Sequence, residues 1–368
     1  MQKKVALVYD RVNKWGGAER VLIALHEIFP KAPLYTSVYD KKSAPWAKVF
    51  PKVHSSFLQK FPWARGNHEF LAMLMPFAFE TFDFSGFDIV ISVTSEFAKN
   101  IRTGNGTKHF CYCLTPTRYL WSAKDFYFEN PPSKFDNIPF FNLLSVPQVK
   151  YLRGRDIAAS RRPDKIIAIS TEVKKRIKKY YKRTSKIIFP PVDMPKFKRR
   201  KTVGKYYLIV NRLIPYKKVD LAVKTFNRLK DPLCIVGVGT EELKLKKMAS
   251  RNIKFLGQVN DAKLRKLYSG AKALIMPQEE DFGIVAVEAQ SFGVPVIAYK
   301  KGGARDTVID GKTGVFFGKQ TVESLSAAVK KFEKLEFVVD NLYTNAGRFS
   351  GKIFKEKVLD LVSEYNRI

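Results

Sequence analysis

Acidic residues and a glycine lie between a strand-like run and a helix-like run from Met276 to Gln290, which reads Met-Pro-Gln-Glu-Glu-Asp-Phe-Gly-Ile-Val-Ala-Val-Glu-Ala-Gln. Gly283 permits close approach of a ligand to the backbone, and the N–H groups of a helix that begins there attract phosphate. Glu280 lies in the predicted loop and Glu288 about one and a half turns into the helix. Both can face one ligand, Glu280 near a sugar and Glu288 beside ribose hydroxyls. The alternative is an acidic first helical turn with a chance second glutamate.

Two basic residues follow the first strand-like run of the C-terminal half. Arg212 and Lys217 are five residues apart in a predicted strand-to-helix loop, so both can converge on one diphosphate. Charge-assisted hydrogen bonds of this kind contribute about 1.5–3 kcal/mol each. An ordinary basic surface loop is the alternative, and the acidic segment further along the chain favours the diphosphate interpretation.

A glycine turn also follows the first strand-like run of the chain, in the segment Lys14-Trp-Gly-Gly-Ala-Glu-Arg20. Gly16 and Gly17 allow a tight turn at the start of a helix, whose N–H groups can face a phosphate or a sugar. The alternative is a turn with no ligand.

Strand-like apolar runs alternate with helix-like patterns along the chain, which predicts α/β domains with largely parallel sheets. The predicted strands are Val5–Tyr9, Leu34–Val38, Asp88–Val93, His109–Leu114, Lys165–Ser170, Tyr206–Val210, Leu233–Val236, Ile253–Leu256, Ala271–Met276 and Val294–Tyr299. The predicted helices are Ala18–Phe29, Val219–Leu229, Glu241–Ala249, Asp261–Ser269, Ile284–Phe292 and an amphipathic one from Ser350. Open parallel sheets bind ligands at the carboxyl ends of their strands, where all three segments above lie.

The length of 368 residues predicts two domains. Two prolines in Phe189–Asp193, followed by the basic stretch Lys196–Lys205, indicate a hinge. We therefore predict an N-terminal domain over residues 1–200, a C-terminal domain over 201–349 and a final helix over 350–368.

Three cysteines are too few for a disulfide framework, which favours a reducing compartment. Cys111 and Cys113 lie two apart in an apolar run, so both point to one face of a strand and we expect them to pack in a core. The first residues enter a strand-like run without a signal peptide, and no run reaches the roughly 20 apolar residues of a membrane span. We expect a cytoplasmic protein.

The net charge of +32 points to a polyanionic partner, which can be a nucleic acid, an anionic lipid surface or a phosphorylated ligand. Between Arg161 and Lys205 there are 17 basic residues against three acidic ones, a local net of +14. The predicted helix Thr171–Arg183 places Val173, Ile177 and a tyrosine on one side and seven basic residues around the rest. The ordinary explanation of these basic residues is a helix face exposed to water. The more specific one is contact with an anionic membrane surface. No recognisable nucleic-acid-binding module accompanies the charge.

Taken together, these motifs resemble the retaining glycosyltransferases of family 4, which have the GT-B fold of two facing Rossmann-like domains. The matching residues are Gly16–Arg20, Arg212 with Lys217, Phe255–Gly257, Glu280 with Glu288, and Gly302–Gly303. More narrowly, Glu279–Gln290, Thr115–Trp121 and Asp156–Asp193 look like the bacterial O-antigen mannosyltransferases of that family.

The resemblance implies roles for individual residues. Arg212 and Lys217 hold the diphosphate and, with Glu280, form the expected catalytic group, while Glu288 binds the ribose. The remaining expected donor-binding residues are Gly16, Gly17, Gly257, Phe282, Gly283, Ile284 and Val285, and the expected acceptor-side residues are Arg118, Tyr119 and Trp121.

The resemblance also implies the partners. They are a nucleotide-sugar donor, GDP-mannose first and a UDP-sugar second, and a glycan acceptor carried on polyprenyl diphosphate at the inner face of the cell membrane. The final helix is expected to cross back onto the first domain. Rival interpretations are a nucleotide-sugar epimerase, a glycogen-type synthase or a polyanion-binding protein.

We expect the reaction to need no metal. The sequence has no Asp-x-Asp motif, and Glu279-x-Asp281 belongs to the donor segment. Basic side chains can neutralise a diphosphate leaving group instead. One position departs from the family pattern, because many relatives have a histidine where Leu114 stands. His109 is expected to be structural.

Overall fold

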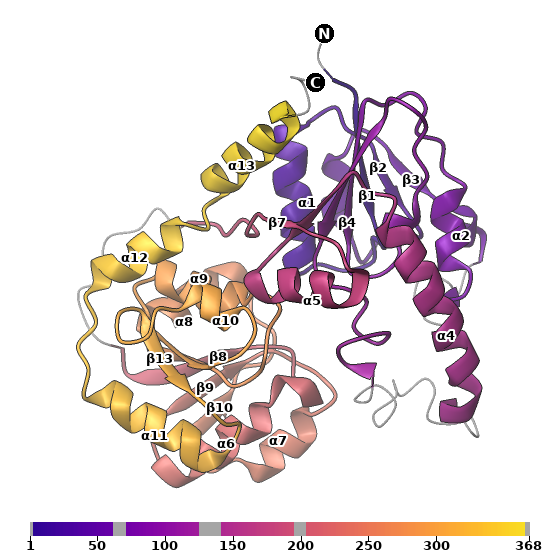
Figure 1. Ribbon diagram of the computed structural model, residues 1–368. Coiled ribbons are helices and arrows are strands. Elements are labelled where there is room, and N and C mark those ends of the chain that lie inside the picture. Colours follow the sequence, from indigo (N-terminus) through magenta and orange to yellow (C-terminus); the bar gives the residue numbers. More distant parts are fainter. Residues whose placement is uncertain (1–2, 62–70, 125–140, 195–203, 365–368) are drawn as a thin grey trace. The chain divides into compact units, whose positions relative to one another are not determined.

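The chain divides into two compact units, Met1–Phe189 and Pro190–Ile368. The computed structural model describes residues 3–61, 71–124, 141–194 and 204–364 (Figure 1). The division falls within the predicted hinge at Phe189–Asp193 and before the predicted boundary at residue 200. The basic stretch that follows the hinge lies largely outside the described residues.

The first unit is built on a parallel sheet with strand order β3-β2-β1-β4-β5-β6-β7 among the described residues. Its strands are β1 Val5–Tyr9, β2 Leu34–Thr36, β3 Val53–Ser55, β4 Ile89–Thr94, β5 Lys108–Cys113, β6 Lys165–Ala168 and β7 Lys186–Ile187. The strand order reverses direction between β1 and β4, which pair directly from Val5 opposite Ile89 to Tyr9 opposite Val93. Loops that follow these two strands therefore meet at one edge of the sheet.

Helices cover both faces of this sheet. They are α1 Gly17–Ile28, α2 Met75–Glu80, α4 Phe141–Ser160 and α5 Thr171–Tyr181. Figure 1 shows α1 on one side of the sheet and α2 and α4 on the other. Ser170 caps α5 by accepting a hydrogen bond from the Val173 N–H at 3.1 Å. Val173, Ile177 and Tyr181 of α5 are buried, as its helical spacing predicts.

The second unit has a parallel sheet with strand order β10-β9-β8-β11-β12-β13. Its strands are β8 Tyr206–Val210, β9 Leu233–Val236, β10 Ile253–Phe255, β11 Ala271–Met276, β12 Val296–Tyr299 and β13 Gly314–Phe317. The central strands are apolar and buried on both faces, which is typical of parallel sheets covered by helices. Here the strand order reverses between β8 and β11.

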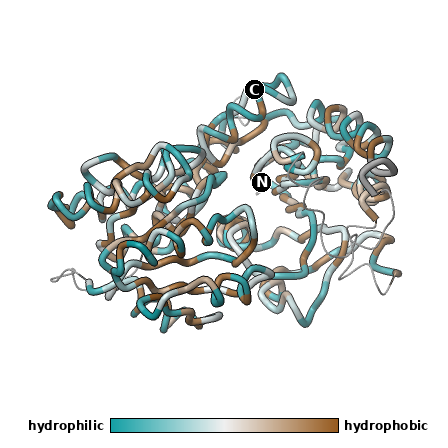
Figure 2. Tube along the Cα trace, turned by 90° about the horizontal axis from the view of Figure 1, so that it is seen from below, coloured by the Kyte–Doolittle hydropathy of each residue, from teal (hydrophilic) through white to brown (hydrophobic). Residues whose placement is uncertain are grey.

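Two apolar clusters join this second sheet to its helices, one on each face. The helices are α6 Val219–Leu229, α7 Glu242–Met248, α8 Asp261–Gly270, α9 Ile284–Ser291, α10 Ala304–Thr307, α11 Val322–Glu333, α12 Val339–Gly347 and α13 Gly351–Ser363. Residues of α6 and α11 pack on one face, and residues of α8 and α9 on the other. Figure 2 shows hydrophilic and hydrophobic residues alternating around the helices, as burial of one side requires.

The predicted fold class of parallel-sheet α/β units is confirmed. Several elements were not predicted: β3, β7, β13, α2, α4, α10, α11 and α12. The longest of these, α4, contains Pro147 within the helix and Gly154, two residues that normally argue against a helical assignment. The predicted crossing of the final helix, α13, onto the first domain stays a prediction.

A carboxylate at the end of α2 joins three arginines of the first unit. Glu80 contacts Arg155 at 2.5 Å and Arg162 at 2.6 Å, both on or just after α4, and Arg102 at 3.2 Å. Partial burial opposes the charge of Glu80, but the three guanidinium groups outweigh it and lower the pKa of this carboxyl. The cluster thus ties α2 to α4 through charge.

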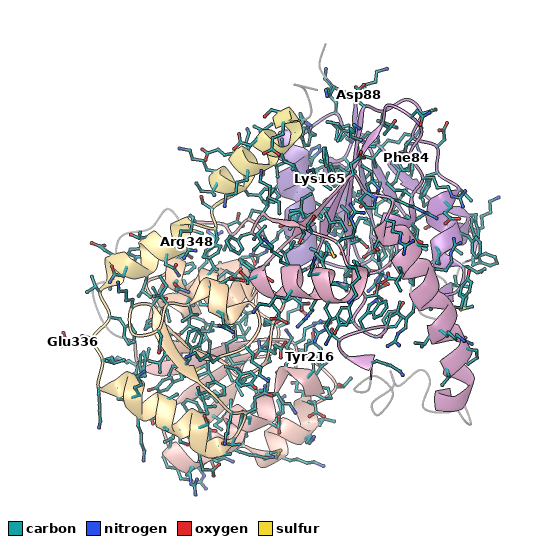
Figure 3. The ribbon with its side chains drawn as sticks, in the orientation of Figure 1. Phe84, Asp88, Lys165, Tyr216, Glu336 and Arg348 are labelled. Atoms are coloured by element: carbon teal, nitrogen blue, oxygen red, sulfur yellow. The ribbon has the colours of Figure 1, made fainter. Side chains whose placement is uncertain are left out.

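The lowered pKa makes this stabilisation dependent on pH. It is fully present above the unfolded-state pKa of a glutamate, about 4.3, and is lost as the pH falls through the lower folded-state pKa. We therefore expect Glu80→Gln to reduce the free energy of unfolding more at pH 7 than at about pH 3. Urea unfolding at both pH values measures this. Glu336→Gln, which changes an exposed carboxylate labelled in Figure 3, is the control, and an equal loss at both pH values for Glu80→Gln would contradict the assignment.

Candidate functional site

The switch point of the second sheet brings together two segments that are far apart in the sequence. Lys217 follows β8, Glu280 follows β11, and these strands are neighbours. The Lys217 ammonium donates to Oε1 of Glu280, forming an ion pair between side chains that are 10% and 17% exposed. The basic loop and the acidic loop therefore meet, and their charged groups lie at the edge where such sheets bind ligands.

The backbone of the loop that carries Lys217 packs closely against two glycines, Gly237 and Gly239. The Gly237 backbone has φ +129°, and a Cβ there would lie 1.7 Å from the carbonyl oxygen of Asn211. A Cβ on Gly239 would lie 2.3 Å from the carbonyl oxygen of Leu213. Gly257 accepts a hydrogen bond from the Gly237 N–H at 2.8 Å. Gly257, predicted to bind the donor, thus also supports the loop beneath Lys217.

Arg212 lies at the start of the same loop and is exposed. Its guanidinium donates to the hydroxyl of Tyr216 at 3.2 Å, and the Lys217 ammonium lies 5.1 Å from the centre of the Tyr216 ring. Tyr216, labelled in Figure 3, therefore contacts both basic residues. One aromatic side chain thus links Arg212 to Lys217, and their convergence on a diphosphate stays a prediction.

Glu280 is fixed through both its side chain and its backbone. Gln278 is fully buried and donates from Nε2 to Oε1 of Glu280 at 2.8 Å. The Gly303 N–H donates to the Glu280 carbonyl at 2.7 Å, and a Cβ on Gly302 would lie 2.2 Å from that carbonyl oxygen. Two donors on one carboxylate oxygen give the Glu280 side chain a defined direction.

Helix α9 begins directly after this loop. Gly283 is its N-cap residue, has φ +90° and provides no side-chain cap. The positive end of the helix dipole and the N–H groups of the first turn lie at this point. Phe282 is buried, and its ring meets Phe349 edge-on at 5.5 Å, while Ile284 and Val285 are half-buried. The geometry suits an anionic group at the start of α9.

Glu288 lies further along α9 and is half-buried. Its Oε2 accepts a hydrogen bond from the hydroxyl of Tyr268 at 2.8 Å. Gln278 and Tyr268 are not among the candidates predicted from the sequence. Neither stands in a distinctive sequence pattern, and both are identified by the acid that each contacts.

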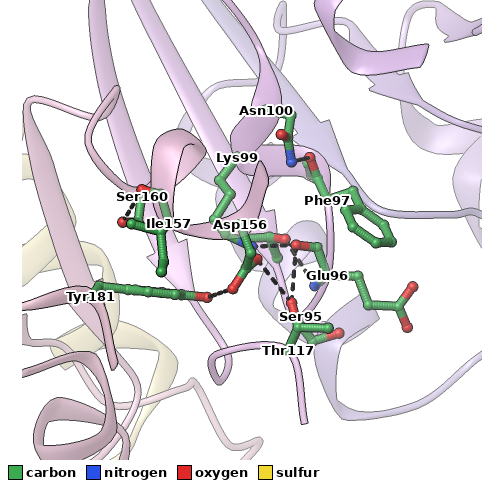
Figure 4. Close-up of polar contacts among 12 residues, drawn as sticks. Ser95, Glu96, Phe97, Lys99, Asn100, Thr117, Asp156, Ile157, Ser160 and Tyr181 are labelled. Atoms are coloured by element: carbon green, nitrogen blue, oxygen red, sulfur yellow. Dashed lines mark hydrogen bonds and ion pairs between the residues drawn. The ribbon is translucent and has the colours of Figure 1, made fainter. Parts of the chain in front are cut away.

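In the first unit, the expected acceptor-side segment is anchored to a buried carboxylate. Asp156 of α4 accepts hydrogen bonds from Thr117 at 3.1 Å, the Trp121 indole at 2.7 Å and the Tyr181 hydroxyl at 2.8 Å. It also pairs with the buried ammonium of Lys99 at 2.5 Å (Figure 4). Burial disfavours the Lys99 charge, but the adjacent Asp156 outweighs it and raises the pKa of Lys99.

The side chain of Trp121 is held by contacts within the first unit. Its ring stacks on Tyr180 at 5.1 Å, and the Arg153 guanidinium lies 5.0 Å from the ring centre. Arg118 and Tyr119, three and two residues before it, are half-buried. The acceptor-side roles of Arg118, Tyr119 and Trp121 stay predictions, and the contacts of Trp121 fix the position of this segment.

The glycine turn begins α1 as predicted, with Gly16 as N-cap and Gly17 as first helical residue. The buried Glu19 carboxylate lies close by, because a Cβ on Gly16 would be 3.2 Å from Glu19 Oε2. The Tyr9 hydroxyl donates to the other oxygen of Glu19 at 2.6 Å. A carboxylate beside the helix start disfavours a phosphate there and favours an uncharged hydroxyl group.

Asp10 holds the neighbouring loop and was not singled out from the sequence. Its buried carboxylate accepts hydrogen bonds from the Thr94 hydroxyl and from the backbone N–H groups of Ser95, Glu96, Phe97 and Ala98, at 2.7–3.0 Å. Asp10 follows β1, and its donors lie at the last residue of β4 and directly after it, so Asp10 links the two strands at the switch point of the first sheet. The feature of the sequence that could have indicated Asp10 is its position directly after the first strand.

Three titratable groups of β5 are buried in the core. His109 lies within β5, and burial lowers its pKa to about 3, so its ring stays neutral, 2.8 Å from the Ser92 hydroxyl. Cys111 and Cys113 are buried free thiols, and burial raises the pKa of Cys111 to about 11. The expectations of a structural histidine and of cysteines packed in the core agree with these positions.

Residues 193–349 match the family described as glycosyl transferases group 1. An uncharacterized glycosyltransferase of Methanocaldococcus jannaschii, MJ1178, is 26% identical over 235 residues, which cover 59% of this chain and 67% of that protein. A glycogen synthase of Pseudomonas syringae pv. tomato is 31% identical over 140 residues, but the match spans only 28% of its length. These matches support glycosyltransferase activity.

Solved structures resemble the chain over nearly its entire length. The lipopolysaccharide outer core galactosyltransferase WaaB has a TM-score of 0.68 at 16% identity, covering 98% of this chain and 99% of WaaB. Anabaena HepE in complex with UDP-glucose has the same TM-score at 16% identity and covers 99% of this chain and 100% of HepE. At this identity the likeness concerns the fold, and it confirms the predicted GT-B class.

The contacts of Asp156 predict a stability effect of a single hydroxyl group. Tyr181→Phe removes one hydrogen bond to a buried carboxylate and should lower the free energy of unfolding by about 1.5–3 kcal/mol. Urea unfolding of the parent and the variant measures this difference. The neighbouring Tyr180→Phe keeps the ring that stacks on Trp121 and serves as control. If both variants unfold at the same urea concentration, the hydroxyl of Tyr181 does not support the network.

Proposed function

We propose that this protein is a retaining glycosyltransferase that moves a sugar from a nucleoside-diphosphate sugar to a glycan acceptor. The contact between Lys217 and Glu280 carries the proposal, because it places a cation and an anion just before the start of α9, within the residues that match the glycosyl transferases group 1 family. A diphosphate and a sugar need these two kinds of group side by side.

The cations act on the leaving group. In the proposed reaction the bond between the sugar carbon and the diphosphate oxygen breaks, and a bond from that carbon to the acceptor oxygen forms on the same face. The acceptor proton passes to the departing phosphate. A lysine ammonium has three donors, so Lys217 can contact Glu280 and the diphosphate together. Arg212 and the N–H groups at the start of α9 add positive charge, and we propose that no metal is required.

The acids bind the donor's uncharged parts. Glu280, directed by Lys217 and Gln278, faces the sugar, and Glu288 accepts hydrogen bonds from the ribose. The backbone from Phe282 to Val285 contacts the phosphates and the sugar. Since Glu19 already faces the start of α1, we propose that the Gly16–Gly17 turn meets sugar hydroxyls.

Two donors are proposed. The resemblance to O-antigen mannosyltransferases favours GDP-mannose. The UDP-glucose complex of HepE supports a UDP-sugar as the alternative. We propose an acceptor linked to polyprenyl diphosphate in surface polysaccharide synthesis, an assignment supported by the fold shared with the lipopolysaccharide galactosyltransferase WaaB. Arg118 and Tyr119 are the proposed acceptor-side contacts.

The proposed site of action is the cytoplasmic face of an anionic membrane. Five lysines on or just after α5 are exposed: Lys174, Lys175, Lys178, Lys179 and Lys182. The other two basic residues of this stretch serve the fold, since Arg176 is buried beside Glu172 and Arg183 donates to the carbonyls of Ser160 and Pro163. The exposed basic face therefore has five of the seven basic residues that the sequence predicts for it.

The apolar residues between Phe57 and Phe84 are a second candidate for lipid contact, and those that the structure describes divide between the core and the surface. Met75, Phe79 and Phe84 pack in the core, whereas Phe57, Phe61, Leu74 and Phe77 are 37–43% exposed. Met73 is half-buried against that core, and Trp63 and Phe70 lie outside the described residues. Among the described helices, none combines the length and apolarity needed to cross a bilayer.

Ligand-dependent stabilisation tests the donor. GDP-mannose, UDP-glucose and ADP-glucose are compared by thermal shift, because a ligand at 100 times its dissociation constant adds about 2.7 kcal/mol to stability. We expect a shift with GDP-mannose or UDP-glucose that persists in EDTA and disappears in Lys217→Ala. The turnover of that variant should fall at least about tenfold.

Lys246→Ala, which removes an exposed lysine–glutamate pair on α7, is the matched control and should keep both properties. Dependence on a divalent metal, or an undiminished shift in Lys217→Ala, would remove Lys217 from the proposed role. Salt-sensitive DNA binding without any response to nucleotide sugars would identify a polyanion-binding protein instead.

Vesicle sedimentation tests the membrane proposal. Each lysine near an anionic surface contributes about 1 kcal/mol, and salt screens this over about 8 Å at physiological ionic strength. We expect binding to anionic but not neutral vesicles, weakened by salt and by the triple change Lys174→Gln, Lys178→Gln and Lys179→Gln. The same change at the exposed α7 lysines Lys244, Lys246 and Lys247 should have no effect. Equal loss in both triple variants would show a response to net charge alone.

A further inference from the structure

One buried tyrosine contacts helix α9 at two points. Tyr268 belongs to α8 and is 1% exposed. Its hydroxyl donates to Oε2 of Glu288 at 2.8 Å, and its ring stacks on Phe292 at 5.4 Å with an interplanar angle of 17°. Phe292 follows Glu288 by four residues, at the end of α9. The ring is thus held against the same helix that carries the acid.

The packing around Tyr268 leaves its hydroxyl group little freedom. The side chain belongs to the apolar cluster on one face of the second sheet, with Met276 of β11 and Ala286 and Ala289 of α9. Helix α8 leads into β11 and α9 follows it, so the three elements pack as consecutive parts of the chain. A half-buried glutamate is therefore bonded to a donor fixed by the core.

We propose that Tyr268 is a positioning residue for ribose recognition. Its hydroxyl holds the Glu288 carboxylate in the orientation that accepts hydrogen bonds from ribose hydroxyls, an inference that rests on the proposed role of Glu288. A carboxylate has about four acceptor positions, so one bond from Tyr268 leaves capacity for the ligand. Fixing a glutamate before the ligand arrives removes the ordering cost from the binding step.

The same domain supplies a matched control. Tyr207 of β8 is also 1% exposed, and its hydroxyl donates to a glutamate, Glu333 of α11. This pair belongs to the opposite apolar face of the sheet from Tyr268. Tyr207→Phe and Tyr268→Phe therefore each remove one hydroxyl from a part-buried tyrosine–glutamate hydrogen bond, but only the second bond involves Glu288.

Calorimetric binding of UDP and GDP to the full-length protein tests the inference. For the nucleotide that binds the parent, Tyr268→Phe should raise the dissociation constant about 3- to 30-fold, while Tyr207→Phe should leave it within about twofold. The 2′-deoxy and 3′-deoxy forms of that nucleotide complete a cycle. The effect of Tyr268→Phe should fall below about twofold for the form that lacks the hydroxyl bound by Glu288.

The outcomes separate the inference from the proposed function. If Glu288→Gln weakens binding and Tyr268→Phe does not, the ribose site stands and the positioning role is wrong. An equal loss in Tyr268→Phe for ribose and both deoxyribose forms would indicate a general packing effect and also overturn it. If Glu288→Gln itself binds like the parent, the ribose assignment fails, and the inference fails with it. Thermal unfolding of both tyrosine variants verifies that each is folded.

Discussion

The contact between Lys217 and Glu280 is the interaction on which the arrangement of the second unit depends. The two residues come from loops after β8 and β11, which are adjacent only because the strand order reverses there. A partly buried cation needs an anion nearby, and each side chain fixes the other. The glycines behind the first loop and the Gly303 N–H behind the second hold the backbones that present this pair.

In the first unit, the loops after the strands are fixed by carboxylates that accept several hydrogen bonds. Asp10 collects backbone N–H groups at the reversal between β1 and β4, and Asp156 joins α4 to α5 and to the segment after β5. In both units, polar side chains stand where strand-end loops would otherwise be free to move. Ordering these loops in advance would reduce the entropy cost of holding a ligand in one orientation.

Much of this could be predicted from the sequence, because local patterns determine it. Strands β1, β8, β9 and β11 have the predicted bounds, since apolar runs bounded by turn residues are strong signals. The segment from Glu280 to Glu288 was found through spacing and glycine. Tyr268 and Asp10 could not be predicted, because they contact residues that are distant along the chain. Gln278 is close to its partner Glu280 in sequence, but it stands in no pattern that indicates the contact. Helix α4 was not predicted because Pro147 disfavours a helix, and its buried residues Leu152, Asp156 and Ala159 lie further along the chain.

The closing glycine pair has a consequence for how this chain can vary. Gly302 has φ +64° and stands where a Cβ would overlap the Glu280 carbonyl, and a Cβ on Gly303 would lie 2.3 Å from the Cα of Phe282. The path of the acidic loop is therefore set by two positions that carry no side chain and need not touch a ligand. Replacing either glycine would displace the backbone of Glu280 and would therefore disturb this carboxylate without changing it. Such a lesion would arise more than 20 residues away along the chain.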